Sequence, residues 1–169
     1  MADIEFTLDG QPLQAHAGET ILQAAQRHGQ AIPHLCFTPG QRAAGNCRAC
    51  VVEIKGERTL APSCCRTVQP GMVVQAKSER AVQSQKLVLE LLLADLPEQG
   101  NDWLDGDASQ PHGELSHWAR HLGVQPRPAL TALRRAAPAA DLSHPAMAVN
   151  LDACIQCTRC VRACRETQM

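Results

Sequence analysis

The nine cysteines constrain this chain more than any other feature. They fall into two groups, at 36–65 and 154–164, and residues 66–153 contain none. The N-terminal stretch MADIEFTLDG has neither a basic region nor an apolar core, so we expect no Sec signal peptide and a cytoplasmic location. Cytosolic thiols stay reduced, and an odd number of cysteines cannot all pair. Metal or iron–sulfur ligation is therefore favoured over a disulfide framework.

Composition limits the remaining choices. A chain of 169 residues suits one medium domain or two small ones. It is 44% hydrophobic but only 2% aromatic, so its core must consist of Leu, Val, Ile and Ala. The net charge of -1 gives no indication of a nucleic-acid or membrane surface. The longest apolar run, 87–96, contains Glu90 and Asp95 and is too short to span a bilayer.

The first 77 residues have the pattern of a small mixed sheet with one helix, an α+β fold. Alternation at 3–8 leads into Asp9-Gly10, a strong hairpin signal. A helix is predicted in GETILQAAQRHGQ, with Gly29 as its stop. The other predicted strands are a returning strand in QPLQAHAG, a hairpin over 50–63 that turns at 55–57, and a last strand in GMVVQAKS.

Three further segments follow. Ser78 is a predicted N-cap of a helix that stops at Pro97, and 99–112 is predicted to be a loop. A second helix, GELSHWARHLGV, places Leu115, Trp118, Ala119 and Leu122 on one face. The predicted domains are a sheet domain at 1–77, a helical segment at 78–124, a Pro/Ala-rich linker at 125–146 and a cysteine-rich unit at 147–169.

The first cysteine group suits a 2Fe–2S cluster. Cys36, Cys47, Cys50 and Cys64 could supply the four thiolates, two for each iron. A Cys-x-x-Cys pair can place two sulfurs on one metal. Gly40 and Gly45 would let the loop backbone approach the inorganic sulfides of the cluster closely. Arg42 and Arg48 add positive charge. A zinc site or a disulfide set made by the same cysteines remains an alternative at this point.

Three segments of this region resemble a known family. IPHLC, GNCRACVVEI and LAPSC match, in order, the 2Fe–2S domain at the N-terminus of the largest peripheral subunit of respiratory complex I, of [FeFe]-hydrogenases and of NAD-dependent molybdenum or tungsten formate dehydrogenases. The resemblance covers about residues 3–77 and implies a β-grasp ferredoxin-like fold. It also implies Cys64 rather than Cys65 as the fourth ligand, because the family's cysteine follows a small residue. Cys65 is then an ordinary thiol.

The second group, CIQCTRCVRAC, has the spacing of bacterial 4Fe–4S ferredoxins. In that pattern Cys154, Cys157 and Cys160 bind one cluster and Cys164 binds a second. The sequence given holds no second run, and Arg165 stands where short ferredoxins have proline. We therefore expect a fragment of a longer subunit, or a partial site completed by another chain. A zinc knuckle is the alternative. Without a cluster or partner, we expect little regular structure in this tail.

The histidines are not predicted to be ligands. Complex I relatives bind a further cluster with one His and three Cys between these two groups, but this sequence has no cysteine there. His112, His117 and His121 are therefore predicted to be surface or structural residues, as are His16 and His28. His34, two residues before Cys36, is a candidate hydrogen-bond donor to a cysteine ligand. The missing ligands make the resemblance to the formate dehydrogenase branch the stronger one.

No nucleophile–base set or glycine-rich phosphate loop stands out, so no catalytic site is predicted in this chain. The resemblance implies an iron–sulfur electron-transfer module, the N-terminal part of a formate dehydrogenase catalytic subunit that relays electrons between a metal–pterin centre and an NAD-reducing partner. Its partners would be the remainder of that complex, not nucleic acid or membrane. One alternative is a free-standing ferredoxin-like carrier or a small subunit of an NAD-linked hydrogenase or dehydrogenase. A zinc scaffold without redox activity is a third reading.

Overall fold

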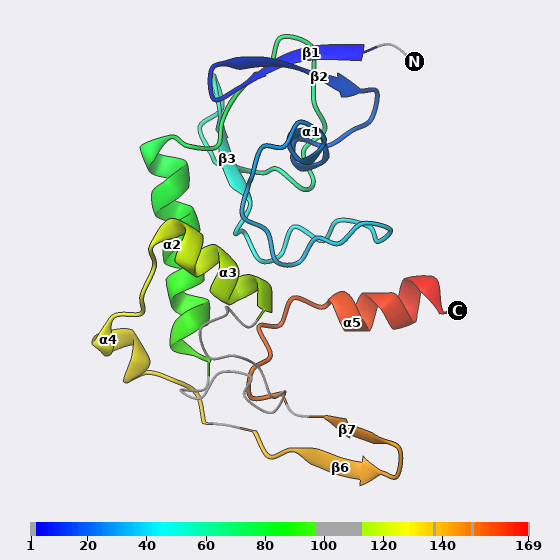
Figure 1. The fold of residues 1–169 in the computed structure, drawn as a ribbon, viewed down its shortest axis with the longest axis vertical. Helices are drawn as coiled ribbons and strands as arrows, with labels where there is room; N and C mark the ends of the chain where they lie inside the picture. The colour runs from blue at the N-terminus through cyan, green and yellow to red at the C-terminus, as the bar shows by residue number, and fades with distance from the viewer. Residues whose placement is uncertain (1–2, 97–112, 137, 150, 169) are drawn as a thin grey trace. The chain divides into compact units, whose positions relative to one another are not determined.

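The computed structural model describes residues 3–96, 113–136, 138–149 and 151–168. The chain divides into two compact units, residues 1–86 with 158–169 and residues 87–157. The first contains a sheet, and the second contains helices and a β-hairpin (Figure 1). The loop predicted at 99–112, the predicted stop at Pro97 and His112 lie outside the described residues.

A five-stranded mixed sheet forms the frame of the first unit, in the order β2-β1-β5-β3-β4. Strand β1 pairs antiparallel with β2 and parallel with β5, whereas β3 pairs antiparallel with both β5 and β4. The predicted α+β fold with a small mixed sheet is confirmed. The strands are β1 (Asp3–Leu8), β2 (Gln11–His16), β3 (Val51–Ile54), β4 (Ala61–Pro62) and β5 (Val73–Gln75).

The turn between β1 and β2 is the predicted two-residue turn. Asp9 and Gly10 have φ values of 49° and 83°, the left-handed pair that matches the twist of a tight hairpin. The Asp9 carboxylate accepts hydrogen bonds from the backbone N–H groups of Ala76 and Lys77, at 2.8 and 3.0 Å. The turn therefore also fixes the chain where it leaves β5.

Helix α1 (Ile21–Arg27) packs one apolar face on the sheet. Thr20 caps it and forms a reciprocal capping box with Gln23, which satisfies two N–H groups of the first turn. The helix ends before Gly29, whose φ is 69°. It is shorter than the predicted 18–30 segment, because the cap at its start and this glycine at its end limit it to two turns.

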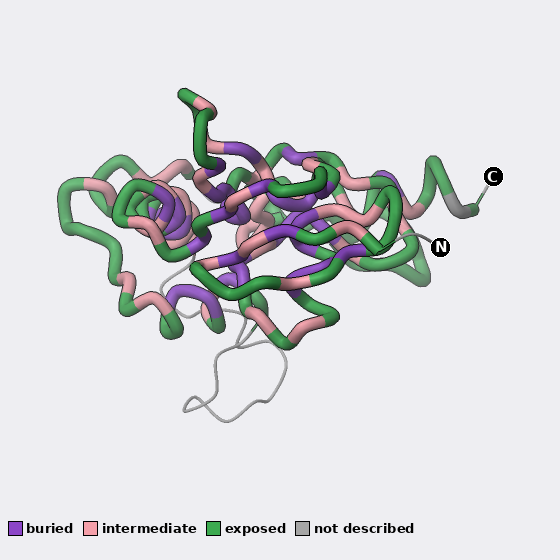
Figure 2. The backbone as a smooth tube through the Cα atoms, turned by 90° about the horizontal axis from the view of Figure 1, so that it is seen from above, coloured by how far each residue is buried: buried purple, intermediate pink, exposed green. Residues whose placement is uncertain are grey.

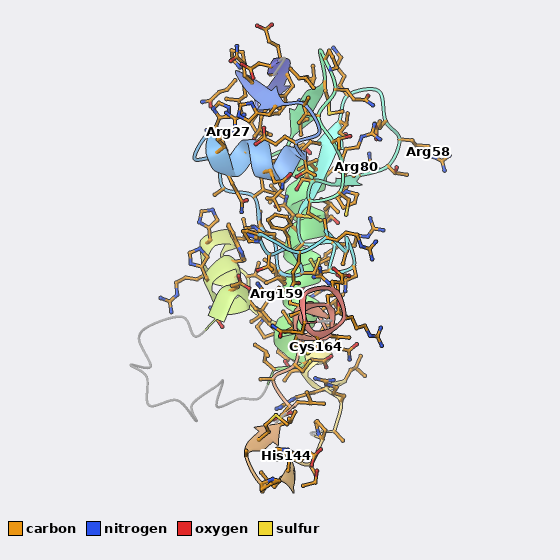
Figure 3. The ribbon with its side chains drawn as sticks, turned by 90° about the vertical axis from the view of Figure 1, so that its right-hand side faces the viewer. Arg27, Arg58, Arg80, His144, Arg159 and Cys164 are labelled. Carbon is orange, nitrogen blue, oxygen red and sulfur yellow. The ribbon has the colours of Figure 1, made fainter. Side chains whose placement is uncertain are left out.

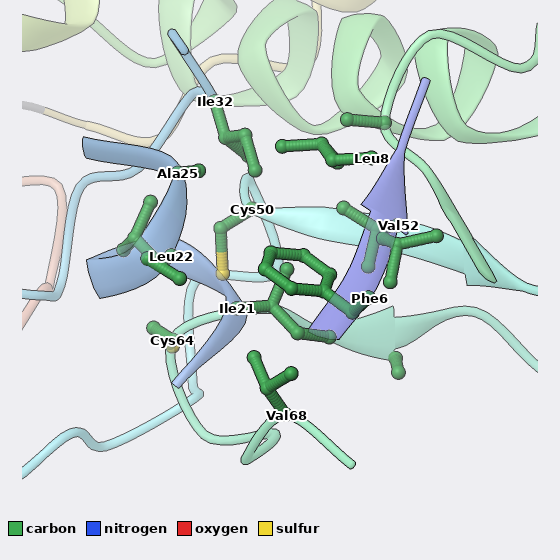
Figure 4. Packing of buried hydrophobic residues seen from close by; sticks show 14 of the residues in the cluster. Phe6, Leu8, Ile21, Leu22, Ala25, Ile32, Cys50, Val52, Cys64 and Val68 are labelled. Carbon is green, nitrogen blue, oxygen red and sulfur yellow. The ribbon is translucent and has the colours of Figure 1, made fainter. Parts of the chain in front are cut away.

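The core of the first unit is mainly aliphatic, as the composition predicts. Figure 2 shows its buried backbone in purple, and Figure 4 shows the packing of its side chains. Cys50 and Cys64 are each 1% exposed and belong to this core, together with Phe6, Leu8, Ile21, Leu22, Ile32, Val52, Val68 and Val74. Two cysteine side chains are thus part of the packing that stabilises the fold.

Helix α2 (Glu79–Ala94) begins as predicted, because the Ser78 hydroxyl accepts a hydrogen bond from Ala81 N–H at 3.2 Å. Gln85, in its middle, is 2% exposed. Its side-chain amide donates to the carbonyls of Val51 at 2.9 Å and Ala76 at 3.3 Å. This amide joins the helix to β3 and to the end of β5.

The second unit contains α3 (Gly113–Leu122), α4 (Pro128–Thr131), β6 (Asp141–His144) and β7 (Met147–Val149), and β6 and β7 pair antiparallel. Leu115, Trp118 and Ala119 are buried on the predicted face of α3. The predicted linker at 125–146 therefore contains a short helix and a strand, which the sequence analysis did not predict. No described helix is long and apolar enough to cross a bilayer.

The described residues 159–167 of the C-terminal tail are helical, and the expectation of little regular structure without a cluster or partner stays a prediction. Helix α5 (Arg159–Arg162) continues into a π-helical turn, η1 (Ala163–Thr167). The physical reason is the Arg162 side chain, which is buried and donates hydrogen bonds to the backbone carbonyls of Cys36 and Arg42. These bonds hold the helix on the first unit.

Gln85→Ala should lower the stability of the first unit. The substitution leaves the carbonyls of Val51 and Ala76 without this donor in a buried position, which costs about 2 kcal/mol. Urea unfolding followed by circular dichroism measures the change. The matched control is Gln83→Ala, an exposed glutamine of the same helix, which should change the unfolding midpoint little. Equal effects of the two substitutions would contradict this role of Gln85.

Candidate iron–sulfur site

Four cysteines of the first group come from three separate segments of the first unit. Cys36 lies in the loop that follows α1, Cys47 and Cys50 precede β3, and Cys64 follows β4. The structure brings them together as two pairs. Cys36 and Cys47 form one pair and Cys50 and Cys64 the other, and within each pair a thiol shifts the pKa of its neighbour. All nine cysteines of the chain are free thiols.

Backbone hydrogen bonds between α1 and the segment after β4 position the second pair. At the start of α1, Leu22 N–H donates to the Ser63 carbonyl at 3.0 Å and Ile21 N–H donates to the Arg66 carbonyl at 2.9 Å. Ser63 N–H in turn donates to the Cys50 carbonyl at 3.1 Å. These bonds use N–H groups that a helix start leaves unpaired, and they fix Cys64 beside Cys50.

The two pairs differ electrostatically. Burial raises the pKa of the Cys47 thiol to about 11. In the other pair, the hydrogen bond from Cys64 lowers the pKa of the Cys50 thiol to about 6 and raises the pKa of Cys64. The interaction within the Cys50–Cys64 pair therefore favours the thiolate form of Cys50, which is the form that binds metal.

Backbone N–H groups also point at these sulfurs. The N–H groups of Ala49 and Cys36 donate to the Cys47 sulfur, and that of Cys64 donates to the Cys50 sulfur. Such bonds stabilise thiolates and tune the potential of a bound cluster. Cys36, Cys50 and Cys64 are each 1% exposed, while Cys47 is half-buried. The Cys50–Cys64 pair belongs to the core, and neither cysteine of the other pair does.

This donor set fits a 2Fe–2S cluster. Such a cluster takes four thiolates, two on each iron, and the structure supplies two thiol pairs with amide donors around them. In the described part of the chain, no three or more His, Cys, Asp or Glu side chains form a site for a single metal ion, whereas a 2Fe–2S cluster needs only two thiolates on each iron. The assignment of four cluster ligands stays a prediction, and the two cysteine pairs are the structural observation that supports it. The predicted ligands are Cys36, Cys47, Cys50 and Cys64.

Cys65 sits beside the site with its sulfur 3.6 Å from that of Cys64. Cys65 is exposed, whereas Cys64 belongs to the core, which agrees with the choice of Cys64 as the ligand. Gly45 approaches Cys65 closely. It has φ of 64°, and a Cβ at this position would lie 2.8 Å from the Cys65 sulfur. Gly45 therefore allows the backbone to approach Cys65, and the predicted approach of Gly40 and Gly45 to the inorganic sulfides of a cluster stays a prediction.

His34 is half-buried near the site. Its Nδ1 lies 2.8 Å from the Ile32 carbonyl, its Nε2 lies 3.3 Å from the Gln26 amide, and its ring meets Phe37 edge-on. Its electrostatic effect lowers the pKa of Cys50. A hydrogen bond from His34 to a cysteine stays a prediction. His117 and His121 are exposed and stack on each other along α3.

The second cysteine group is divided between the two units, so its two halves are described separately. In the second unit, the Arg135 guanidinium donates to the Cys154 carbonyl at 2.9 Å, and Arg134 lies 3.4 Å from the Asp152 carboxylate. Gln156 N–H donates to the Cys154 sulfur at 3.4 Å. The loop that carries Cys154 is therefore held by arginines from the predicted linker.

In the first unit, Cys160 lies in α5 and Cys164 in η1, both exposed (Figure 3 labels Cys164). The binding of a 4Fe–4S cluster by Cys154, Cys157, Cys160 and Cys164 stays a prediction. The sequence did not predict the roles of Arg135 and Arg162. Their guanidinium groups donate hydrogen bonds to the backbone carbonyls of Cys154 and Cys36. The only signal in the sequence is the number of arginines near the motif, which does not separate these two from exposed Arg165.

Comparison with known proteins agrees with the iron–sulfur assignment. Residues 1–79 match the family model described as a 2Fe-2S iron-sulfur cluster binding domain. The chain is 34% identical over 167 residues to the mitochondrial NADH-ubiquinone oxidoreductase 78 kDa subunit of Neurospora crassa, covering 95% of this chain and 21% of that protein. It is 34% identical over 179 residues to the NADP-reducing hydrogenase subunit HndD of Solidesulfovibrio fructosivorans, covering 99% of this chain and 28% of that protein.

A solved structure of an NAD+-reducing [NiFe]-hydrogenase in the H2-reduced state also superposes on the chain. The TM-score is 0.78 at 33% identity, with 97% of this chain and 67% of that chain covered. The chain thus spans only 21% to 28% of the length of the curated relatives named above.

Cys47→Ala should abolish the visible absorbance of the anaerobically prepared protein and lower its unfolding temperature, because cluster binding and folding are coupled. Cys65→Ala should leave both unchanged, since Cys65 is exposed and outside the two pairs. Absorbance spectra and thermal unfolding of the two variants check this. If Cys65→Ala bleaches the protein and Cys64→Ala does not, the choice of the fourth ligand is wrong.

Gly45→Ala should destabilise the first unit through both strain and a clash with Cys65. The left-handed backbone alone costs about 1–2 kcal/mol for a residue with a Cβ. Gly40→Ala is the control for strain, because its φ is 83° and nothing lies within 4 Å of the added Cβ. The double variant Gly45→Ala/Cys65→Ala should recover the part of the unfolding free energy that the clash with Cys65 removes, as measured by urea unfolding. No regain in the double variant would show that Cys65 does not set the requirement for Gly45.

Proposed function

The chain belongs to the family of the NADH-quinone oxidoreductase 78 kDa and NAD-reducing hydrogenase subunits, whose N-terminal 2Fe–2S domain it carries, and we propose that it relays single electrons within an NAD-linked oxidoreductase complex. The observation that supports this proposal most directly is the presence of two cysteine pairs, Cys36–Cys47 and Cys50–Cys64, the second of which lies in the core. When bound there, a 2Fe–2S cluster supplies one-electron redox chemistry.

The residues of the chain would have three tasks. Cys36, Cys47, Cys50 and Cys64 hold the irons. The N–H groups of Ala49 and Cys64 stabilise sulfur charge without bringing in a titrating group. The packing of Cys50 and Cys64 among Ile21 and Leu22 excludes water from one side of the site (Figure 4). The second cysteine group, Cys154, Cys157, Cys160 and Cys164, would hold 4Fe–4S clusters, in part with ligands from outside this sequence.

The finer proposal is that the chain forms the N-terminal iron–sulfur region of a molybdenum or tungsten formate dehydrogenase catalytic subunit, located in the cytoplasm. The absence of cysteine between residues 66 and 153 favours it, because this leaves no ligand set for the additional His–Cys cluster of complex I relatives. The electrons would then pass between a metal–pterin centre and an NAD-reducing partner.

The second candidate is a small electron-transfer subunit of an NAD-linked hydrogenase. The solved hydrogenase chain favours it, because 67% of its length is covered by this chain. Metal analysis of the complex isolated from the native source distinguishes the two: molybdenum or tungsten supports the formate dehydrogenase assignment, and nickel supports the hydrogenase assignment.

The anaerobically purified chain should contain at least about two iron atoms and two acid-labile sulfides and should show an electron paramagnetic resonance signal after reduction, as a 2Fe–2S centre requires. Iron, sulfide and zinc analyses with spectroscopy of the reduced protein make the measurement. Colourless protein with zinc in place of iron would overturn the proposal, since zinc carries no redox chemistry.

A further inference from the structure

Arg162 is the one arginine among the buried polar and charged residues of the described chain, at 8% exposed. It stands between Cys160 and Cys164 on the C-terminal helical segment. Its Nη2 donates to the Cys36 carbonyl and its Nη1 to the Arg42 carbonyl, each at 2.5 Å. The two arms of one guanidinium therefore hold two points of the loop that carries Cys36.

Weaker contacts join the same two segments. The Gln41 side-chain amide donates to the Arg159 carbonyl at 3.3 Å, and the Asn46 amide lies 3.5 Å from the Thr158 hydroxyl. Arg42 and Glu166 form an exposed ion pair at 3.8 Å. Figure 3 shows Arg159 and Cys164 on this helical segment. Arg162 differs from these neighbours because its side chain is buried and its hydrogen bond to the Cys36 carbonyl is buried as well.

The charge of Arg162 has no carboxylate partner among the described residues. A buried cation without a counter-charge is costly, and two carbonyl dipoles offset only part of that cost. The neighbouring loop carries Cys36, one of the four predicted cluster ligands. When it binds a cluster, Cys36 would bring a negatively charged thiolate to this loop.

We propose that Arg162 is a positioning residue that holds the Cys36 loop and raises the reduction potential of the 2Fe–2S centre. The effect on the reduction potential rests on the proposed function, whereas the holding of the Cys36 loop does not. Reduction adds one electron and so one negative charge, and a nearby buried cation stabilises the reduced form more than the oxidised form. Removal of this cation therefore lowers the potential.

The experiment compares Arg162→Met and Arg162→Lys with the control Arg165→Met. Arg165 is exposed and close by on the same helical segment, so the control removes the same charge from the surface. Two readouts are needed: a redox titration followed by electron paramagnetic resonance, and hydrogen–deuterium exchange of the amides in 36–46. The full chain is used throughout.

Arg162→Met should lower the equilibrium constant for reduction about tenfold, which is about 59 mV for a one-electron couple, and should speed exchange in 36–46. Arg162→Lys keeps the charge but lacks the rigid fork of donors, so its potential should stay near that of the wild type while exchange still increases. Arg165→Met should change neither readout, because its charge is exposed and screened.

Equal potentials in Arg162→Met and Arg165→Met would overturn the inference, as would a loss of potential in Arg162→Lys as large as in Arg162→Met. If Arg162→Met does not fold, amide exchange in 36–46 is compared between Arg162→Lys and Arg165→Met instead. Faster exchange in Arg162→Lys supports the inference, and equal exchange overturns it. If the wild type contains no iron or sulfide, the proposed function fails. Amide exchange in the iron-free protein then tests whether Arg162 holds the Cys36 loop, and equal exchange in Arg162→Met and Arg165→Met overturns this.

Discussion

The pairing of Cys50 with Cys64 inside the hydrophobic core is the interaction on which the rest of the first unit depends. It requires that β3 and the segment after β4 meet beneath α1, and the hydrogen bonds from Ile21 and Leu22 to that segment make them meet. The cysteines are therefore both core residues and candidate ligands. Loss of a ligand disturbs packing as well as metal binding, which is the physical basis for coupling between the cluster and the fold.

Arginine–carbonyl hydrogen bonds recur at both cysteine groups. Arg162 holds the loop of Cys36 in the first unit, and Arg135 holds the loop of Cys154 in the second. A guanidinium suits this task because its planar fork can donate to several backbone carbonyls at once and never loses its charge. One arginine side chain in each unit thus holds a loop that carries a cysteine.

The sequence predicted the parts of the fold that rest on local chemistry. The Asp9-Gly10 turn, the Thr20–Gly29 segment of α1 and the Ser78 cap follow from residues that favour one backbone geometry. The hairpin of β6 and β7 was missed, because its residues have weak local preferences. The C-terminal helix is held by contacts from Arg162 to residues more than a hundred positions away, which no local pattern reveals.

The sequence by itself determined which cysteines belong together as groups, that the first 77 residues form a mixed sheet with one helix, and that a cluster is more plausible than disulfides. Spacing and turn chemistry carry that information along the chain. Only the tertiary structure decided that Cys36 pairs with Cys47 and Cys50 with Cys64, that Cys65 faces outward, and that Arg162 is buried while Arg165 is exposed. These outcomes depend on which distant segments fold against each other, and side chains of the same type have no local signal that distinguishes them.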